Sequence, residues 1–194
     1  MAEHKSNISK SQEDHKLHNR KLIDSRKGIF TILGLLSLRL PGQWWWHSED
    51  INEPNAKGSI FRTWGDGDPS GLDIAYLLVV DVTDDPTEPD ISVLTRADVP
   101  SIDQFLQKGI AQSLKENEIE LVKWMSSQLN ETDSNKGLVT AYITLDQGKE
   151  RQFIVLRLSI KGHKVVVMGC FDVEQRKILA GPIFEALQNV KVLN

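Results

Sequence analysis

The stretch that decides the fold is GLVTAYITLDQGKERQFIVLRLSIKGHKVVVMGCFD, residues 137–172. It holds three apolar segments, residues 138–145, 152–160 and 164–171, with the alternation or the unbroken apolar runs typical of β-strands. The segments are joined by DQGKER and KGH, which are short and contain glycine. Such connections join antiparallel neighbours, so this stretch predicts a three-stranded antiparallel meander.

A helical pattern lies on either side of the meander. The first helix is predicted to begin at Ser101, which forms a capping-box pattern with Gln104. Its apolar stripe consists of Ile102, Phe105, Leu106, Ile110 and Leu114. Gly109 inside this helix is expected to let another backbone approach. The second helix covers residues 173–190, and Pro182 predicts a kink or a restart within it. Its apolar positions are Ile178, Leu179, Ile183, Phe184 and Leu187.

Further strand patterns precede and follow the first helix. They cover residues 29–33, 35–40, 59–64, 72–82 and, as a short piece, 91–95, with NEPNAKG at 52–58 predicted as a loop. From Ile119 the period changes to two, so Ile119, Leu121, Lys123 and Met125 are expected to face away from Val122 and Trp124. Two separated helices with one apolar stripe each need a sheet to bury against. The sequence therefore predicts an α+β fold, an α/β/α sandwich around a mainly antiparallel sheet.

Length and charge favour one domain with a distinct start. The 194 residues are 40% hydrophobic and 26% charged, which is ordinary for a single globular domain. Residues 1–28 are polar and carry a net charge of +3, whereas the rest carries −7. We expect residues 1–28 to be a flexible basic tail and residues 29–194 to form the domain.

Motifs for catalysis or metal binding are missing. Cys170, the single cysteine, is flanked by apolar residues, which predicts a small buried apolar side chain without a disulfide partner. In GDGDPSG, residues 65–71, Asp66, Asp68, Ser70 and Gly71 match the opening of a calcium-binding loop. The twelfth position counted from Asp66 is Leu77 instead of glutamate, which favours a simple turn. No phosphate-binding loop or nucleophile elbow is present. We expect no catalytic residue, no metal and no cofactor.

Charge and hydropathy also bear on partners and location. A net charge of −4 gives no reason to expect nucleic acid, and no apolar run approaches the ~20 residues of a membrane helix. The first residues lack the basic-then-apolar order of a secretory signal. These features favour a cytoplasmic protein, or an exported one if a signal has been removed.

Three consecutive tryptophans stand in LPGQWWWHSED, residues 40–50. Neighbouring side chains of a strand point to opposite faces, so all three cannot be buried on one side. Trp44 is expected to cap the core at the end of a strand. At least one of Trp45 and Trp46 is expected to lie off the core, against a partner, a second copy of the chain or the acidic segment 83–90.

The sequence resembles the PsbP-like family over residues 29–193. The resemblance rests on GLLSLRLPGQW at 34–44, the meander at 137–172 and IFEALQNVKV at 183–192. The family includes the extrinsic PsbP protein of photosystem II, a yeast Ran-binding protein, bacterial lipoproteins and the Eag chaperones of type VI secretion. Its motifs fix hydrophobic pattern and turns, and no catalytic residue. The tryptophan triplet and the acidic segment depart from its pattern.

The resemblance implies a binding scaffold. In Eag chaperones the sheet shelters a helix of a secreted effector, usually within a homodimer. By resemblance, we expect a non-enzymatic chaperone, adaptor or immunity-type partner that binds an effector or membrane-protein helix in the helix-in-groove mode. The candidate partner-binding residues are Trp44, Trp45, Trp46, Tyr142, Phe153 and Val155. Two alternatives stay open: an extracytoplasmic accessory protein of a membrane complex, and a small-ligand binder or enzyme with a pocket between sheet and helix.

Overall fold

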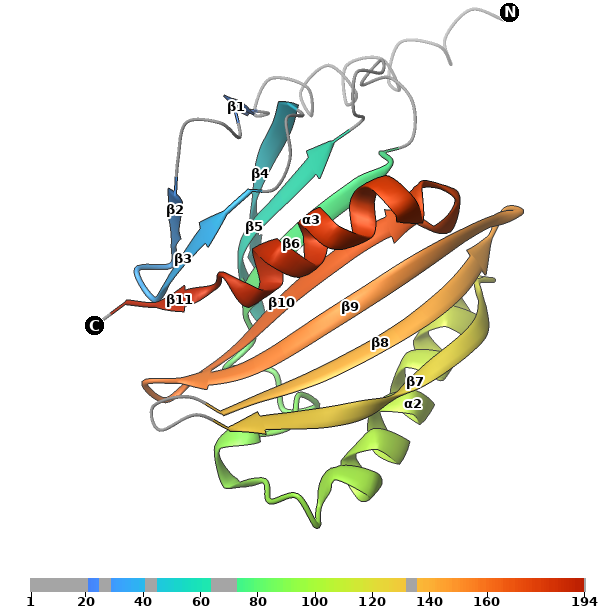
Figure 1. The fold of residues 1–194 in the computed structure, drawn as a ribbon. Coiled ribbons are helices and arrows are strands. Elements are labelled where there is room, and N and C mark those ends of the chain that lie inside the picture. Colours follow the sequence, from blue (N-terminus) through green and yellow to red (C-terminus); the bar gives the residue numbers. More distant parts are fainter. Residues whose placement is uncertain (1–20, 25–28, 41–44, 64–72, 132–135, 194) are drawn as a thin grey trace, which may run out of the picture.

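The computed structural model describes residues 21–24, 29–40, 45–63, 73–131 and 136–193 (Figure 1). An eight-stranded sheet forms the centre, with strand order β1-β4-β5-β6-β10-β9-β8-β7 and antiparallel pairing throughout. Its strands are β1 Lys21–Asp24, β4 Trp45–Glu53, β5 Ala56–Thr63, β6 Ala75–Asp81, β7 Glu120–Glu131, β8 Lys136–Asp146, β9 Lys149–Ile160 and β10 His163–Asp172. A three-stranded sheet is built from β2 Ile29–Ile32, β3 Leu36–Arg39 and β11 Lys191–Val192.

The meander predicted at residues 137–172 is present as β8, β9 and β10. Its two connections are two-residue turns at Gln147–Gly148 and Lys161–Gly162, and all four residues have positive φ. Glycine adopts positive φ at no steric cost, and such turns match the twist of antiparallel strands. The expected α+β sandwich with a mainly antiparallel sheet is confirmed.

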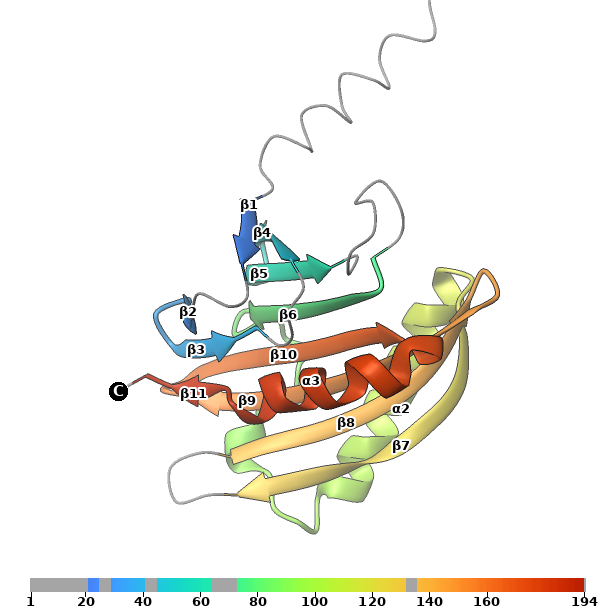
Figure 2. The ribbon, with the colours of Figure 1, turned by 45° about the horizontal axis from the view of Figure 1, so that its top comes forward.

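The two faces of the large sheet have different covers (Figures 1 and 2). Helix α3, Arg176–Gln188, and the small sheet lie over one face and enclose the main core with β4, β5, β6, β9 and β10. Helix α2, Val99–Glu116, lies against the other face at β7. The chain between β6 and α2 includes the short 3-10 helix η2, Ile91–Val93, which packs on β8 and β9.

Gly169 of β10 explains how closely α3 packs on the sheet. A methyl group at this position would overlap the Cγ2 atom of Ile183, a fully buried residue of α3. Glycine therefore permits a helix–sheet contact that a larger residue would prevent. Helix α3 runs through Pro182 without ending there, so the restart predicted at this proline does not occur.

Several local predictions were wrong. The predicted loop 52–58 is mostly strand, because β4 and β5 form a hairpin that turns at Pro54 and Asn55. Residues 91–93 are a 3-10 turn stabilised by the Asp90 carboxylate, which accepts from Ser92 N at 2.9 Å. Strand β1 lies within the segment expected to be tail, and pairs with β4.

The start of α2 and the pattern of β7 also differ from expectation. Helix α2 begins at Val99 with Pro100 in its first turn, where a missing N–H costs nothing, so Ser101 lies inside it and caps nothing. A methyl group at Gly109 would meet no atom within 4 Å, so no backbone approaches there. Strand β7 contains irregularities between Leu121 and Lys123 and between Met125 and Gln128, which break the simple alternation.

Trp46 belongs to the main core. Its exposed fraction is 0%, and it packs in the same cluster as Phe61 and Leu77. Trp44 lies outside the described residues, and the side chain of Trp45 is likewise outside them. Trp46 therefore does not contribute to an accessible surface, because other residues of the chain bury it completely.

Replacing Trp46 tests this assignment. Trp46→Ala should lower the free energy of unfolding by about 3–5 kcal/mol, because it removes a large buried side chain and leaves a cavity. Phe105→Ala is the matched control, since Phe105 is 53% exposed on α2 and should change stability by less than about 1 kcal/mol. Denaturant titration of both variants measures the difference. Equal, small losses would show that Trp46 does not support the core.

Candidate binding groove

The alternation of β8 and β9 divides their side chains between the two covers. Tyr142 of β8 pairs with Phe153 of β9, and Thr140 pairs with Val155, so these four residues share one face. That face is the one on which α2 lies, because Leu138, two positions before Thr140, packs against Leu106 of α2. The intervening residues, among them Val139, Ile154 and Leu156, therefore face α3.

An open apolar groove lies on the α3 side of the sheet. Its volume is about 380 Å³. The groove residues come from β7, β8, β9, α3 and the segment after α3, and they are Gln128, Asn130, Gly137, Val139, Ile154, Leu156, Leu158, Phe184, Leu187, Val190 and Val192. We call this surface the α3 groove. It forms because α3 packs on β10 and β3, which leaves β8 and β7 uncovered beside it (Figure 1).

The chemistry of the α3 groove is apolar. None of its lining residues carries a charge, and the polar side chains are the amides of Gln128 and Asn130 on β7. Phe184 is 42% exposed, although large apolar side chains of a helix normally face a core. A concave surface of this kind favours apolar groups of a ligand or partner, with the amides able to bond one edge.

The opposite face carries a row of aromatic side chains across neighbouring strands. The rings of Trp124 and Tyr142 stack with centroids 5.8 Å apart, and those of Tyr142 and Phe153 stack at 4.8 Å. Phe153 also meets Tyr76 edge-on at 6.4 Å, and the Arg62 guanidinium lies 5.8 Å from the Tyr76 ring centroid. Aromatic pairs on one sheet face stabilise strand pairing, so this row primarily supports the sheet.

The candidate site residues on β8 and β9 fall on this second face. Tyr142 is 7% exposed and Val155 is 3% exposed, so the chain buries both. Phe153 is half-buried, and its contact with a partner stays a prediction. The α3 groove is lined by alternate positions of these same two strands, on the other face of the sheet. Period-two alternation separates the residues of a strand into two sets, but it does not identify which face of the sheet remains open.

An ion-pair cluster lies at the Asp73 end of the aromatic row. The Asp73 carboxylate accepts from Arg62 Nη1 at 2.8 Å and from Arg151 Nη1 at 3.0 Å, and Arg151 Nε lies 3.1 Å from Asp172 Oδ1. Burial raises the pKa of the Asp172 carboxyl, which Arg151 opposes. These contacts link β5, β9 and β10 to the segment just before β6, so they stabilise the arrangement of these strands.

Cys170 lies in this region and is fully buried, as predicted. Burial raises the pKa of its thiol to about 12, so the thiolate, the reactive form, is suppressed near neutral pH. In the described part of the chain, no three His, Cys, Asp or Glu side chains are grouped so as to hold a metal ion. No described helix is long and apolar enough to cross a membrane.

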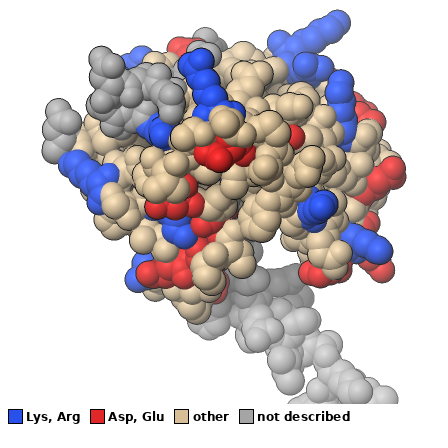
Figure 3. All heavy atoms as spheres, turned by 90° about the horizontal axis from the view of Figure 1, so that it is seen from below, with Lys and Arg blue, Asp and Glu red and all other residues tan. Residues whose placement is uncertain are grey.

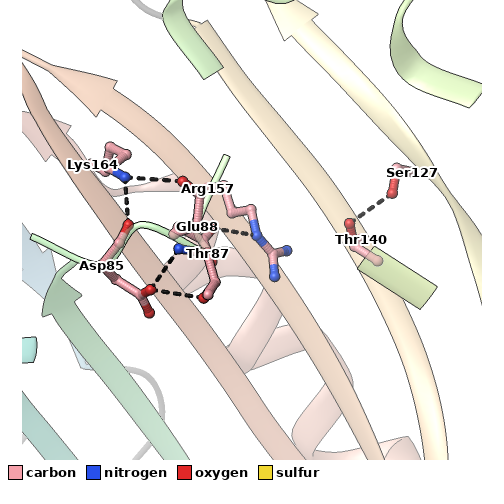
Figure 4. A network of polar contacts seen from close by, with 7 residues as sticks. All are labelled: Asp85, Thr87, Glu88, Ser127, Thr140, Arg157 and Lys164. Carbon is pink, nitrogen blue, oxygen red and sulfur yellow. Dashed lines mark hydrogen bonds and ion pairs between the residues drawn. The ribbon is translucent and has the colours of Figure 1, made fainter. Parts of the chain in front are cut away.

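A strap of chain, residues 83–98, lies over the α2 side of β8, β9 and β10 (Figure 4). Lys164 Nζ donates to the carbonyl oxygens of Asp85 and Glu88 at 2.7 and 2.9 Å. Arg157 Nε donates to the Glu88 carboxylate at 2.6 Å. Burial raises the pKa of Glu88 although Arg157 opposes the shift, so ionised Glu88 weakens the folded state relative to the protonated form.

The charged surface on the underside of the molecule is mixed. Figure 3 shows Lys and Arg interspersed with Asp and Glu there, with uncharged surface between them. No continuous basic stripe crosses the described residues seen in this view.

The fold is similar to that of a known solved structure. The solution structure of cyanobacterial PsbP (CyanoP) from Synechocystis sp. PCC 6803 matches with a TM-score of 0.55 and 12% sequence identity, over 90% of this chain and 93% of that chain. This chain has the PsbP-like fold.

A Pseudomonas aeruginosa protein of unknown function, PA94, gives a TM-score of 0.42 with 9% identity, over 86% of this chain and 97% of that chain, a likeness too weak to support an inference. The sequence matches no protein-family model. It also matches no curated protein.

The buried state of Cys170 can be tested by thiol labelling. A maleimide reagent at pH 7 should leave the native protein unmodified, because the sulfur is inaccessible and its pKa is about 12. In denaturant the reagent should modify one thiol per chain within minutes. Mass spectrometry counts the adducts, and rapid labelling of the native protein would contradict the assignment.

The ionisation of Glu88 gives a pH dependence with a definite sign. Its folded pKa is raised, so the folded state binds this proton more tightly than the unfolded state does. Wild-type protein should therefore gain stability relative to Glu88→Gln as the pH falls through the folded pKa of Glu88. Denaturant titrations of both proteins from pH 7 to pH 4.5 measure the difference, and a difference that is constant or of opposite slope would contradict the shift.

Proposed function

We propose that this chain is a non-enzymatic protein-binding module that holds an apolar segment of another protein in the α3 groove. The observation that carries the proposal is an open groove on a large sheet whose lining contains no charged side chain. Alternate side chains of β7, β8 and β9 form its floor and α3 forms one wall, an arrangement that suits helix-in-groove recognition. The module would act as a chaperone or adaptor.

The groove suits a segment that must be kept from water. Val139 and Leu156 are half-buried and Phe184 is 42% exposed, so an apolar segment seated there would bury surface that now meets solvent. Each 100 Å² of apolar surface removed from water contributes about 2.5 kcal/mol before the costs of association. Gln128 and Asn130 would bond polar groups at the segment's edge.

Photo-crosslinking at Phe184 tests the proposal. A photoreactive phenylalanine analogue at Phe184 should give a covalent adduct with another protein in the native cell. The same analogue at Phe105 provides the matched control, because Phe105 is 53% exposed on the other helix. Gel analysis and mass spectrometry identify the adducts. Equal adducts from both positions, or none from Phe184, would contradict the proposal.

A second variant links the adduct to the groove. Val139→Glu places a charge on the groove floor and should reduce the Phe184 adduct at least about tenfold, because a buried unpaired charge is costly. Val122→Glu is the control, since Val122 is 44% exposed on β7 and is not among the groove residues. Thermal melts of both variants confirm that each remains folded.

A small apolar ligand is the second candidate occupant. The groove volume of about 380 Å³ falls within the range of roughly 300–1,000 Å³ found for ligand pockets. Native mass spectrometry of the purified protein distinguishes this case. A bound small molecule that Val139→Glu displaces and Val122→Glu retains would favour a ligand carrier over a protein-binding module.

A further inference from the structure

The strap, residues 83–98, and α2 together form the cover of one sheet face. Its fully buried apolar cluster is small: Ile91, Leu94 and Leu106 are 2%, 7% and 5% exposed and pack against Leu138. Ile102 of α2 packs half-buried at the edge of this cluster. Of the side chains of α2, Leu106 alone is buried. The cluster under α3 and the small sheet contains many more buried residues, including Trp46 and Phe171 at 0%. Apolar burial therefore holds the cover much less firmly than it holds α3.

Polar contacts provide most of the cover's specific attachments. Asp103 Oδ1 on α2 accepts from Trp124 Nε1 at 3.0 Å and from the backbone N–H of Ser127 at 2.7 Å, both on β7. Lys136 Nζ on β8 donates to the carbonyl oxygens of Ser92 and Leu94 at 3.3 and 2.6 Å. The first of these attachments lies on the helix and the second on the strap, which Arg157 and Lys164 also hold through Asp85 and Glu88. Each half of the cover therefore has polar attachments of its own.

The closed cover leaves a polar group unsatisfied. Arg157 is 7% exposed and donates through Nε to Glu88, but its Nη1 atom is buried without a hydrogen-bond partner among the described residues. An unpaired buried donor destabilises the closed form, and this cost disappears when the strap opens and water bonds to the donor. Lifting the strap therefore recovers hydration for Arg157 and Glu88 together, which offsets part of the lost apolar contact.

We infer that the strap and α2 open from β7, β8, β9 and β10 as one cooperative unit while the sheet itself stays folded. Segments with few buried apolar contacts open at lower free energy than a protein's core, often as contiguous units. The strap runs directly into α2 at Val99, and Leu94 and Leu106 share one cluster, so either half loses its packing when the other leaves. Opening uncovers Leu138 and Trp124 next to the stacked rings of Tyr142 and Phe153.

This inference is independent of the proposed function, because the α3 groove lies on the other face of the sheet. Opening of the cover would expose more of the aromatic face, of which the closed chain buries Tyr142 and half-buries Trp124 and Phe153. Tyr142 is 7% exposed in the closed form. Access to Tyr142 then depends on the equilibrium between the closed and the open cover, which substitution of Asp103 or Lys136 can shift.

Native-state hydrogen exchange over a denaturant series tests the inference. Amides of the strap and α2 should share one opening free energy, below that of amides in β8, β9 and β10. Asp103→Ala removes two hydrogen bonds to a charged acceptor and should accelerate exchange throughout the strap and α2 by at least about tenfold, leaving β9 and β10 within twofold. Glu116→Ala, at the exposed end of α2, is the control and should change neither segment more than twofold.

A reciprocal variant tests the coupling from the strap. Lys136→Met removes the bonds to Ser92 and Leu94 and should also accelerate exchange in α2, which it does not contact through those bonds. Lys108→Met, exposed on α2, is its matched control. Exchange of the cover only through global unfolding would overturn the inference. Acceleration confined to α2 in Asp103→Ala and to the strap in Lys136→Met would overturn it equally.

Discussion

The structure depends on one constraint: the central strands of the large sheet are apolar on both faces. In β9, Ile154 and Val155 are neighbours that point to opposite faces, and their exposed fractions are 2% and 3%. Antiparallel sheets commonly leave one face to water, but strands of this composition require covers on both. The described elements outside the large sheet serve that requirement: α3 and the small sheet lie on one face, and α2 and the strap lie on the other.

The two covers meet the requirement by different physical means. The α3 side relies on close packing, to the point that Gly169 must lack a side chain where Ile183 approaches. The other side combines a small apolar cluster with hydrogen bonds and ion pairs from Lys136, Arg157 and Lys164. Closely packed side chains tolerate little displacement, whereas hydrogen-bonding side chains can replace their protein partners with water. The α3 side therefore defines a fixed groove, and the α2 side is the one that can move.

Sequence patterns predicted the elements of this architecture better than their exposure. The meander, the terminal helix and the buried thiol of Cys170 followed from period-two alternation, helical periodicity and apolar flanks. Alternation assigns residues to two faces but says nothing about how far a helix extends over either, so Tyr142 and Val155 were expected at an accessible surface that their neighbours Val139 and Leu156 occupy. The strand at Trp45–Glu53 was missed because His47, Glu49 and Asp50 lack the apolar alternation of a strand, and its formation depends on tertiary pairing with β1 and β5.

The position of the α3 groove follows from the width of the sheet. The large sheet has eight strands, and one helix with a three-stranded sheet covers only part of that width. Helix α3 lies over β10, and β11 returns the chain to β3. The elements that cover this face therefore lie toward β4, β5 and β6 and do not extend over β7 and β8. Strands β8 and β9 nevertheless keep apolar residues such as Val139 and Leu156 on the uncovered side. An uncovered apolar surface carries a free-energy cost that burial by another molecule would relieve. The apolar groove residues Val139 and Leu156 pack against the core on one side and meet solvent on the other, and this exposed apolar area is the physical argument for a binding role at this surface.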